Sequence, residues 1–325
     1  MREQPAPWRR SAPTVLLPGA GGSAAVCALK SLRLAEYPGR VVATDSDPLA
    51  AGFRFADAHH TVPSAGDAGF VETALALIAR EGVEVILPTS GFDTRVYSRL
   101  KRELARRAVV AAVCDPDAIA DTEDKWRFHW RVREAFPLPR TWRPGDAGIT
   151  FPCFVKPKSG KGSRESVRCA DAAALARHMT NGADVLVQEY LPGDEYSVDV
   201  LSDLAGNPLG AVPRLRLAIR GGISVKGRVV RDPEIQDLCL AMSRYLGLKG
   251  VTCMQLRRDG GGQLRFLEVN PRLGGASIFA TLAGVNLPLL LVRIACGEAI
   301  EMPEFREVTV LRYFEELVVE DGAPE

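Results

Sequence analysis

The first 118 residues repeat one pattern: a short apolar run, a turn, and a segment with the apolar spacing of a helix. The apolar runs are rich in β-branched residues and stand at 14–17, 40–44, 83–87 and 109–113. Strands that alternate with helices in this way form a parallel, doubly wound sheet. The pattern therefore predicts an α/β unit over residues 1–118.

The rest of the chain follows a different pattern. Residues 119–184 combine a strand, a polar glycine-rich loop over 158–164 and a helix, which predicts a small lobe. Residues 185–325 contain longer alternating strands at 195–201, 209–217, 251–257 and 264–269, with helices beside them. Such strands predict an antiparallel sheet covered by helices, so we expect the second half to be α+β.

Composition narrows the class of function. The chain has 325 residues, 25% of them charged, and a net charge of +1, so charge gives no reason to expect binding to nucleic acid or to a membrane. The seven cysteines form no CxxC pair, which argues against a structural zinc site or a disulfide scaffold. No apolar run approaches the roughly 18 residues that span a bilayer. We expect a cytoplasmic protein that acts on small molecules.

The segment at 266–275 carries the strongest chemical signal. Glu268 and Asn270 are two residues apart, so on a strand they project from the same face. Arg272, Gly274 and Gly275 follow directly. An acid and an amide supply oxygen ligands for a divalent cation, and an arginine suits a phosphoryl group. The segment predicts a site that holds a metal ion and a polyphosphate together.

A hairpin brings a third oxygen to this face. The sequence Asp-Gly-Gly-Gly at 259–262 separates two predicted strands. If Gly261 and Gly262 form a two-residue turn, residues 260 and 263 pair and Gln255 falls opposite Glu268. Directly opposed side chains lie about 4.5–5.5 Å apart at Cβ. Gln255, Glu268 and Asn270 would then share one face and suit magnesium.

Two segments upstream suit the rest of a nucleotide. Lys156 ends an apolar strand, and the loop after it offers glycine amides and further cations to phosphates, without the spacing of a Walker A loop. At 187–199 a strand runs through a turn into a second strand, where the backbone of 189–191 can pair with a purine and Glu195 with a ribose. Taken alone, the first segment is also typical of a basic surface hairpin and the second of an acidic turn.

The first turn of the chain supports a different function. Residues 19–24 read Gly-Ala-Gly-Gly-Ser-Ala, and Asp45 closes the next predicted strand. In a dehydrogenase the glycines would admit a pyrophosphate and the acid would hold a ribose hydroxyl. The alternative function is therefore a nicotinamide-dependent oxidoreductase that uses this GxGxxA turn. A tight strand-to-helix turn with Asp45 as a turn former explains the same residues.

In their order, these segments resemble the ATP-grasp superfamily, and especially carbamoyl-phosphate-synthase-like carboxylate–amine ligases, including the pyrrolysine-biosynthesis lysine ligase type. The resemblance covers nearly the whole chain. It rests on Asp124-Lys125, 155–157, 188–191 with Gly193 and Glu195, and 268–272. It implies an ATP-grasp fold that follows a Rossmann-like pre-ATP-grasp domain.

The resemblance also implies roles for individual residues. The residues implied to bind ATP are Lys125, Lys156, Ser159, Gly160, Gly162, Ser163, Glu189, Tyr190, Leu191 and Glu195. Those implied to bind Mg²⁺, for which Mn²⁺ can substitute, are Gln255, Glu268 and Asn270. Arg272 and Lys156 are the catalytic residues, since Arg272 would stabilise the transferring phosphoryl group. Gln255 stands where many family members have an acid, which leaves the number of metal ions open.

The activity implied is ATP-dependent ligation of a carboxylate to an amine through an acyl phosphate, with release of ADP and phosphate. We expect small-molecule substrates, amino acids in particular. In the basic stretch that contains Arg214 and Arg216, Arg220 is predicted to clamp the substrate carboxylate, and a solvated strand edge explains the same residues equally well. Gly274 and Gly275 are predicted to leave room beside the acyl phosphate. Family members of this size are often dimers, so the resemblance implies a homodimer. A third alternative for the function is a non-catalytic regulator that binds a nucleotide.

Overall fold

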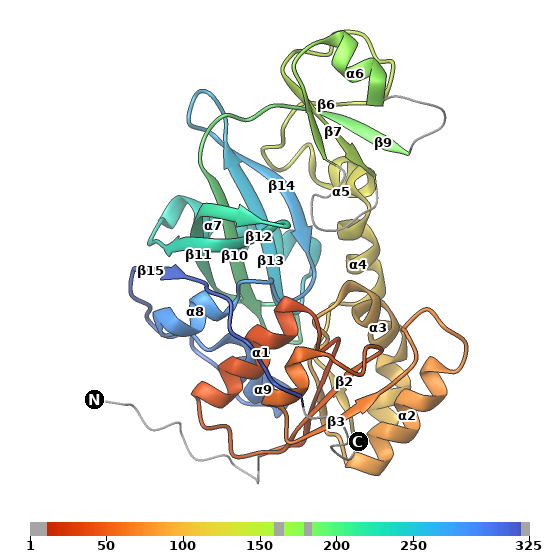
Figure 1. The fold of residues 1–325 in the computed structure, drawn as a ribbon. Helices are drawn as coiled ribbons and strands as arrows, with labels where there is room; N and C mark the ends of the chain where they lie inside the picture. Colours follow the sequence, from red (N-terminus) through yellow and green to blue (C-terminus); the bar gives the residue numbers. More distant parts are fainter. Residues whose placement is uncertain (1–11, 159–165, 179–183, 320–325) are drawn as a thin grey trace.

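The computed structural model describes residues 12–158, 166–178 and 184–319, and it contains three sheets (Figure 1). A five-stranded sheet has the order β3-β2-β1-β4-β5, a four-stranded sheet the order β6-β9-β7-β8, and a six-stranded sheet the order β14-β13-β10-β11-β12-β15. None of the helices in the described ranges is long and apolar enough to cross a membrane.

The N-terminal unit is the predicted parallel α/β sheet. Its strands are β1 (Val15–Pro18), β2 (Val41–Asp45), β3 (Ala58–Thr61), β4 (Val85–Ile86) and β5 (Val110–Ala111), and all pairs are parallel. The helical elements are α1 (Ser23–Leu34), η1 (Ala51–Phe55), α2 (Phe70–Glu81) and α3 (Gly91–Arg106). The order places the carboxyl ends of β1 and β4 side by side, where ligands bind in doubly wound sheets.

The edge strand β3 was not predicted. It contains His59 and His60, and its residues alternate between partly buried and exposed. Neither histidine favours a strand intrinsically, so the parallel pairing with β2 decides its conformation.

The small lobe follows two helices, α4 (Pro116–Glu123) and α5 (Lys125–Val132). Its elements are β6 (Thr141–Trp142), β7 (Cys153–Pro157), β8 (Val167–Cys169), α6 (Ala172–His178) and β9 (Val185–Glu189). The expected domain boundary after residue 184 would assign β9 to the next unit. In the structure β9 pairs with β6 and β7, so the sheet of this lobe extends to Glu189.

The large lobe is the predicted antiparallel sheet with helices. Its elements are β10 (Glu195–Ser202), β11 (Pro208–Arg220), β12 (Ile223–Val229), α7 (Pro233–Leu246), β13 (Gly250–Arg258), β14 (Leu264–Asn270), α8 (Ile278–Ala283), α9 (Leu287–Ala295) and β15 (Val308–Leu311). In Figure 1 the small lobe lies at the top, the large lobe below it, and the N-terminal unit at the bottom.

The large-lobe sheet has two chemically different faces. On one face Val198, Met254 and Phe266 are buried in an apolar core that α7 shares. Because side chains alternate along a strand, Glu195 on β10 and Gln255 on β13 fall on the opposite face, and the bulge between Phe266 and Glu268 lets Glu268 pair with Gln255 on that same face. The lower part of that opposite face is again apolar and packs with α1, α8 and α9. Its upper part is polar and carries the candidate site.

The predicted pairing of Gln255 with Glu268 is confirmed, although the predicted turn is wrong. Asp259 N–H donates to Gln263 O at 2.8 Å, so the loop has three residues and ends at Gly262 with φ +81°. That turn alone would shift the register by one residue. A bulge opposite the step from Gln255 to Leu256 restores it. Two irregularities therefore compensate.

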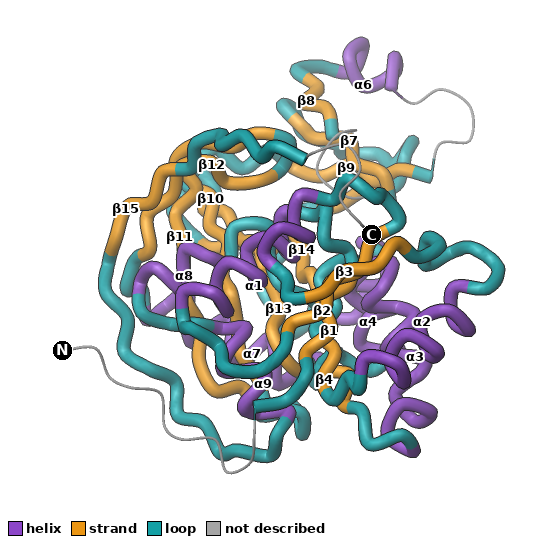
Figure 2. The backbone as a smooth tube through the Cα atoms, turned by 60° about the horizontal axis from the view of Figure 1, so that its bottom comes forward, coloured by secondary structure: helices purple, strands orange, loops and turns teal. Residues whose placement is uncertain are grey.

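The N-terminal unit and the large lobe share their cores. Helix α1 packs with α8 and α9 in one apolar cluster that also includes Val15 and Leu17 of β1 (Figure 2). After β15, the chain returns towards the N-terminal unit. There Arg312 Nη2 donates to Cys27 Sγ at 3.2 Å and Arg54 Nη2 donates to Val318 O at 2.7 Å.

Candidate active site

Two of the three predicted metal ligands, Glu268 and Asn270, line a cavity of about 370 Å³, whereas Gln255 is not part of its lining. Asn270 Nδ2 donates to Glu268 Oε1 at 2.9 Å, and Arg272 Nη2 reaches Asn270 Oδ1 at 3.4 Å. All three side chains line the cavity together with Lys125 at the start of α5. The first turn of α3, which includes Phe92, completes the wall, so the N-terminal unit borders the same cleft.

The donor set fits a magnesium ion. Glu268 and Asn270 supply oxygens from one strand face, and Mg²⁺ is commonly held by one or two carboxylates together with substrate phosphates. Among the described residues there is no cluster of three His, Cys, Asp or Glu side chains that would hold a metal by protein ligands alone. The cation that suits this face is therefore one shared between protein and polyphosphate.

Lys156 lies on β7 at the side of the small lobe. Its Nζ donates to Gln188 Oε1 at 2.7 Å. Burial lowers the pKa of Lys156 to about 8, although nearby Glu268 and Glu195 act in the opposite direction. Lys125 lies close enough to lower that pKa further. The two lysines that the sequence predicted to bind phosphate are therefore together beside Glu268.

The middle of the cleft is organised by an arginine that the sequence did not single out. Arg216 on β11 donates through Nη1 to Glu195 Oε1 and, at 3.1 Å, to Gln255 Oε1. Arg257 Nη1 approaches the other oxygen of Glu195 at 3.5 Å. The alternation of β11 puts Arg214 and Arg216 on one sheet face, but only the pairing of β10, β11 and β13 brings Arg216 to Glu195 and Gln255.

The predicted purine end forms a second cavity, of about 360 Å³, between β9 and the β13–β14 hairpin. Glu189 N–H donates to Arg140 O at 2.9 Å, and Tyr190 N–H donates to Pro152 O at 3.3 Å. Leu191 N–H has no acceptor within the described part of the chain. An edge of a base can therefore pair with the backbone at Leu191 rather than with the two preceding amides.

The predicted substrate residues lie elsewhere around the cleft. Arg220 is exposed at the end of β11, before a two-residue turn in which Gly221 and Gly222 have φ +56° and +76°. Its guanidinium lies 5.3 Å from the centroid of the Phe314 ring. Arg216, not Arg220, is the arginine of this strand that contacts the predicted nucleotide residues.

Packing accounts for the two small residues after Arg272. A Cβ on Gly274 would lie 2.8 Å from Cys253 Sγ, and one on Gly275 would lie 2.6 Å from Ser23 Oγ. These contacts explain both glycines without a substrate. The predicted residues Ser159, Gly160, Gly162 and Ser163 lie outside the described residues.

In the N-terminal glycine turn, the carboxylate of Asp45 accepts hydrogen bonds from the backbone. Asp45 Oδ2 accepts the N–H of Gly21 at 2.7 Å, and Asp45 Oδ1 accepts the N–H of Asp47 at 2.9 Å. A dinucleotide would place its pyrophosphate at this helix N-terminus and would need such amides. The carboxylate weighs against the oxidoreductase alternative and supports the use of Asp45 as a turn former.

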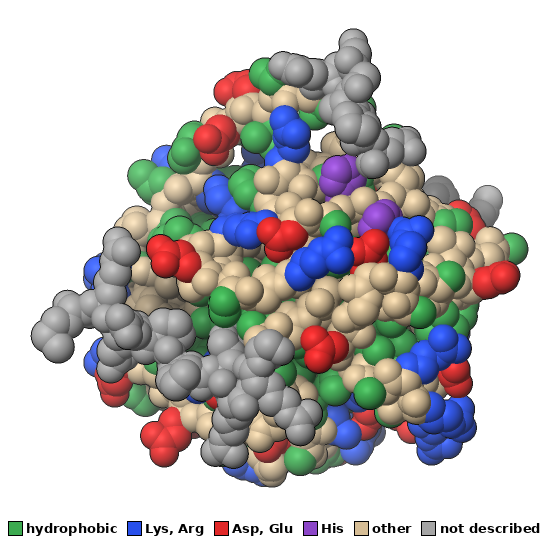
Figure 3. All heavy atoms as spheres, turned by 90° about the horizontal axis from the view of Figure 1, so that it is seen from below, with side chains coloured by type: hydrophobic (Ala, Val, Ile, Leu, Met, Phe, Trp, Pro, Cys, Tyr) green, Lys and Arg blue, Asp and Glu red, His purple; other side chains and the backbone are tan. Residues whose placement is uncertain are grey.

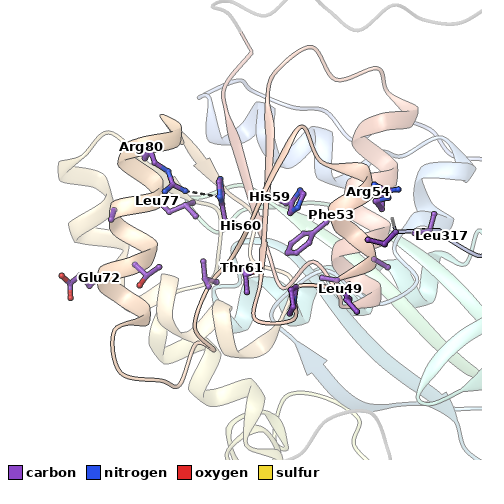
Figure 4. A pocket seen from close by; sticks show the side chains of 17 residues that line it. Leu49, Phe53, Arg54, His59, His60, Thr61, Glu72, Leu77, Arg80 and Leu317 are labelled. Carbon is purple, nitrogen blue, oxygen red and sulfur yellow. Dashed lines mark hydrogen bonds between the residues drawn. The ribbon is translucent and has the colours of Figure 1, made fainter. Parts of the chain in front are cut away.

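A separate cavity of about 1090 Å³ lies between η1, β3, α2 and the C-terminal segment (Figure 4). Phe53 stacks on His59, with ring centroids 4.6 Å apart. Both ring nitrogens of His60 have partners, Glu81 at 3.0 Å and Arg80 at 3.1 Å. On the face of the molecule seen in Figure 3, acidic and basic side chains are interspersed. We assign no reaction to this larger cavity, because its histidine His60 is held by Glu81 and Arg80.

Comparison with known proteins agrees with this geometry. Residues 181–317 match the family "ATP-grasp in the biosynthetic pathway with Ter operon", and residues 15–104 match the family "PylC-like, N-terminal domain". The chain belongs to the ATP-grasp superfamily. Its fold is an ATP-grasp fold with a Rossmann-like N-terminal domain, as the sequence predicted.

Curated relatives are distant. A D-alanine–D-alanine ligase of Anaeromyxobacter sp. (strain K) is 28% identical over 178 residues, 50% of this chain and 54% of the ligase. The large chain of carbamoyl phosphate synthase from Halomonas eurihalina is 26% identical over 249 residues, 69% of this chain and 23% of that one. The chain thus spans about half the length of the ligase and about a quarter of the synthetase chain.

Solved structures show the same fold at low identity. The N5-carboxyaminoimidazole synthetase of Staphylococcus aureus complexed with ADP has a TM-score of 0.72 at 14% identity, covering 92% of this chain and 82% of that one. The biotin carboxylase domain of Hydrogenobacter thermophilus 2-oxoglutarate carboxylase, in complex with MgADP and bicarbonate, has a TM-score of 0.71 at 19% identity, covering 90% and 71%.

Proposed function

We propose that this ATP-grasp protein is an ATP- and Mg²⁺-dependent ligase that joins a carboxylate to an amine and releases ADP and phosphate. The observation that carries the proposal is the cavity in which Glu268, Asn270 and Arg272 face Lys125. Acidic, amide and cationic groups meet there as a metal ion and a phosphate chain require. The names of the relatives, a D-alanine–D-alanine ligase and a carbamoyl phosphate synthase chain, support ligation and an amino-acid carboxylate.

The chemistry follows from the weakness of a carboxylate as an acyl donor. Its charge repels a nucleophile, and oxide is a poor leaving group. Transfer of the γ-phosphoryl group to a carboxylate oxygen gives an acyl phosphate, which an amine attacks with loss of phosphate. Bound Mg²⁺ neutralises charge on the phosphates. We assign Lys125 and Lys156 to the phosphates and Arg272 to the transferring group, since positioned cations stabilise charge that develops in the transition state.

The same proposal orders the rest of the cleft. Leu191 would pair with the base and Glu195 with the ribose, and the N-terminal unit would help to enclose the substrates near Phe92. Exclusion of water matters here because water would hydrolyse the acyl phosphate. The homodimer and the cytoplasmic location expected from the sequence remain predictions.

The experiment is a screen for phosphate release from ATP over amino acids and small carboxylates, each with and without an amine. We expect release that needs both substrates and falls at least about 100-fold in Glu268→Gln, which keeps the shape but loses the charge. Glu301→Gln changes an exposed acid and is the matched control. AMP and pyrophosphate as products, or equal activity in Glu268→Gln, would contradict the proposal.

A further inference from the structure

The side chain of Arg216 is buried and hydrogen-bonded on several sides, although the proposed chemistry gives it no role. Its side chain is 4% exposed. Besides Glu195 and Gln255, it donates through Nε to Ser224 Oγ at 3.2 Å and through Nη2 to Gly222 O at 2.7 Å. A guanidinium has five N–H donors in a rigid fork. Those of Arg216 contact four acceptors, which lie on β10, β12, β13 and the β11–β12 turn. The charge is therefore fixed in the cleft.

This arrangement determines which way the Gln255 amide faces. A guanidinium can only donate, so the atom of Gln255 that lies 3.1 Å from Arg216 must be the oxygen. The amide nitrogen consequently faces away from Arg216. Nitrogen of an amide carries two protons and does not bind a cation. Gln255 therefore shares a sheet face with Glu268, but its oxygen lies 3.1 Å from a fixed guanidinium nitrogen, and this positive charge would repel a cation bound at the same oxygen.

The other half of the face differs in this respect. Asn270 and Glu268 are half-buried and contact each other, and Arg272 reaches Asn270 only at 3.4 Å. Although Arg272 donates to the Asn270 oxygen, the neighbouring Glu268 carboxylate has no ion pair in the described part of the chain, so this half carries a negative charge that can attract a cation. The two halves of the predicted metal face are thus unequal. The half with Glu268 and Asn270 can take a cation, whereas the half with Gln255 already faces the guanidinium of Arg216.

We propose that this site holds a single divalent cation, on Glu268 and Asn270, and that the guanidinium of Arg216 takes the place of a second ion at Gln255. Arg216 is then a positioning residue that also orients Glu195 for the ribose. The inference rests on the proposed nucleotide site. It explains why a neutral glutamine suits position 255: an acid there would pair with Arg216 and compete with Glu195 for its charge.

The test counts Mn²⁺ ions bound per ADP by electron paramagnetic resonance at saturating nucleotide. We expect one ion in the unmodified chain and one in Gln255→Glu, because Arg216 neutralises the new carboxylate. We expect two in Gln255→Glu combined with Arg216→Met, where the carboxylate is freed. Arg216→Met alone should weaken ADP binding about tenfold through loss of Glu195 orientation. Arg228→Met, on an exposed arginine of β12, is the matched control.

Two ions in the unmodified chain, or two in Gln255→Glu alone, would overturn the inference while leaving the ATP-grasp function intact. Gln255→Glu removes no buried contact, so this arm stands even if Arg216→Met does not fold. If the unmodified chain binds neither ADP nor ATP with Mn²⁺, the proposed function and this inference both fail. One ion in the double variant would also overturn the role given to Arg216.

Discussion

At the scale of single residues, the site places two lysine side chains close together, which disfavours the charged form of one of them. Lys156 lies beside Lys125, and burial lowers its pKa to about 8 from an ordinary 10.5. A polyphosphate next to this ammonium favours its charged form and restores the proton. Nucleotide binding and the charge of Lys156 are therefore coupled.

This coupling predicts a pH dependence. Above pH 8 the free protein increasingly lacks the Lys156 proton, so MgATP affinity should fall as pH rises from 7 to 9.5, with proton uptake on binding. Isothermal titration calorimetry in buffers of different ionisation enthalpy measures both. Lys156→Arg keeps a charge at every pH and should remove the dependence. An unchanged affinity across this range in the unmodified chain would contradict the assignment of Lys156 to the phosphates.

The stability of the folded chain should respond to pH in the opposite direction from the affinity for MgATP. Between about pH 8 and 10.5 the unfolded chain holds a proton on this lysine that the folded chain has lost. The contribution of Lys156 to the free energy of unfolding should therefore rise with pH across that window in the absence of nucleotide.

At the scale of elements, the β13–β14 hairpin shows how far sequence reasoning reaches. Alternation of apolar and polar residues predicts both strands and the shared face of Glu268 and Asn270, because period 2 is a local property. The loop length and the bulge opposite Gln255 depend on how two strands twist together, which no single segment encodes. Arg216 was missed for the same reason, since its role depends on the pairing of three strands. Arg220, chosen from its neighbouring glycines, instead marks a turn.

The hairpin loop gives a stability prediction. Gly262 has φ +81°, so Gly262→Ala should lower the free energy of unfolding by about 1–2 kcal/mol. Urea unfolding followed by circular dichroism measures it. Gly261→Ala is the control, because a Cβ there meets only Asp259 Oδ1 at an ordinary 3.4 Å, and its effect should stay within about 0.5 kcal/mol. Equal losses in the two variants would contradict the three-residue loop.

At the scale of the whole molecule, the N-terminal unit and the large lobe share two large apolar cores, whereas the small lobe has a small core of its own. Each of the two main clusters combines residues of the N-terminal unit with residues of the large lobe. The small lobe has its own cluster, whose buried members are Cys153, Val155, Cys169, Leu175 and Val187. Burial of little apolar surface gives a local unit a low opening free energy. The small lobe is therefore the part that can move over a nucleotide.

Native-state hydrogen exchange should show this division. Amides of β7 and β9 should exchange faster than those of β10 and β13 in the free protein, and MgADP should slow the first group most. Equal protection in both lobes without nucleotide, or protection that MgADP leaves unchanged, would contradict the account of the cleft between them.

The most direct test of the proposed chemistry follows one oxygen atom. An amino-acid mixture labelled with ¹⁸O in its carboxylates is incubated with the protein, MgATP and an amine, and the phosphate products are analysed by ³¹P nuclear magnetic resonance. An acyl phosphate formed at the Glu268 site transfers one labelled oxygen to inorganic phosphate, so we expect ADP and ¹⁸O-phosphate in equal amounts. Unlabelled phosphate, or label in AMP with release of pyrophosphate, would contradict the account.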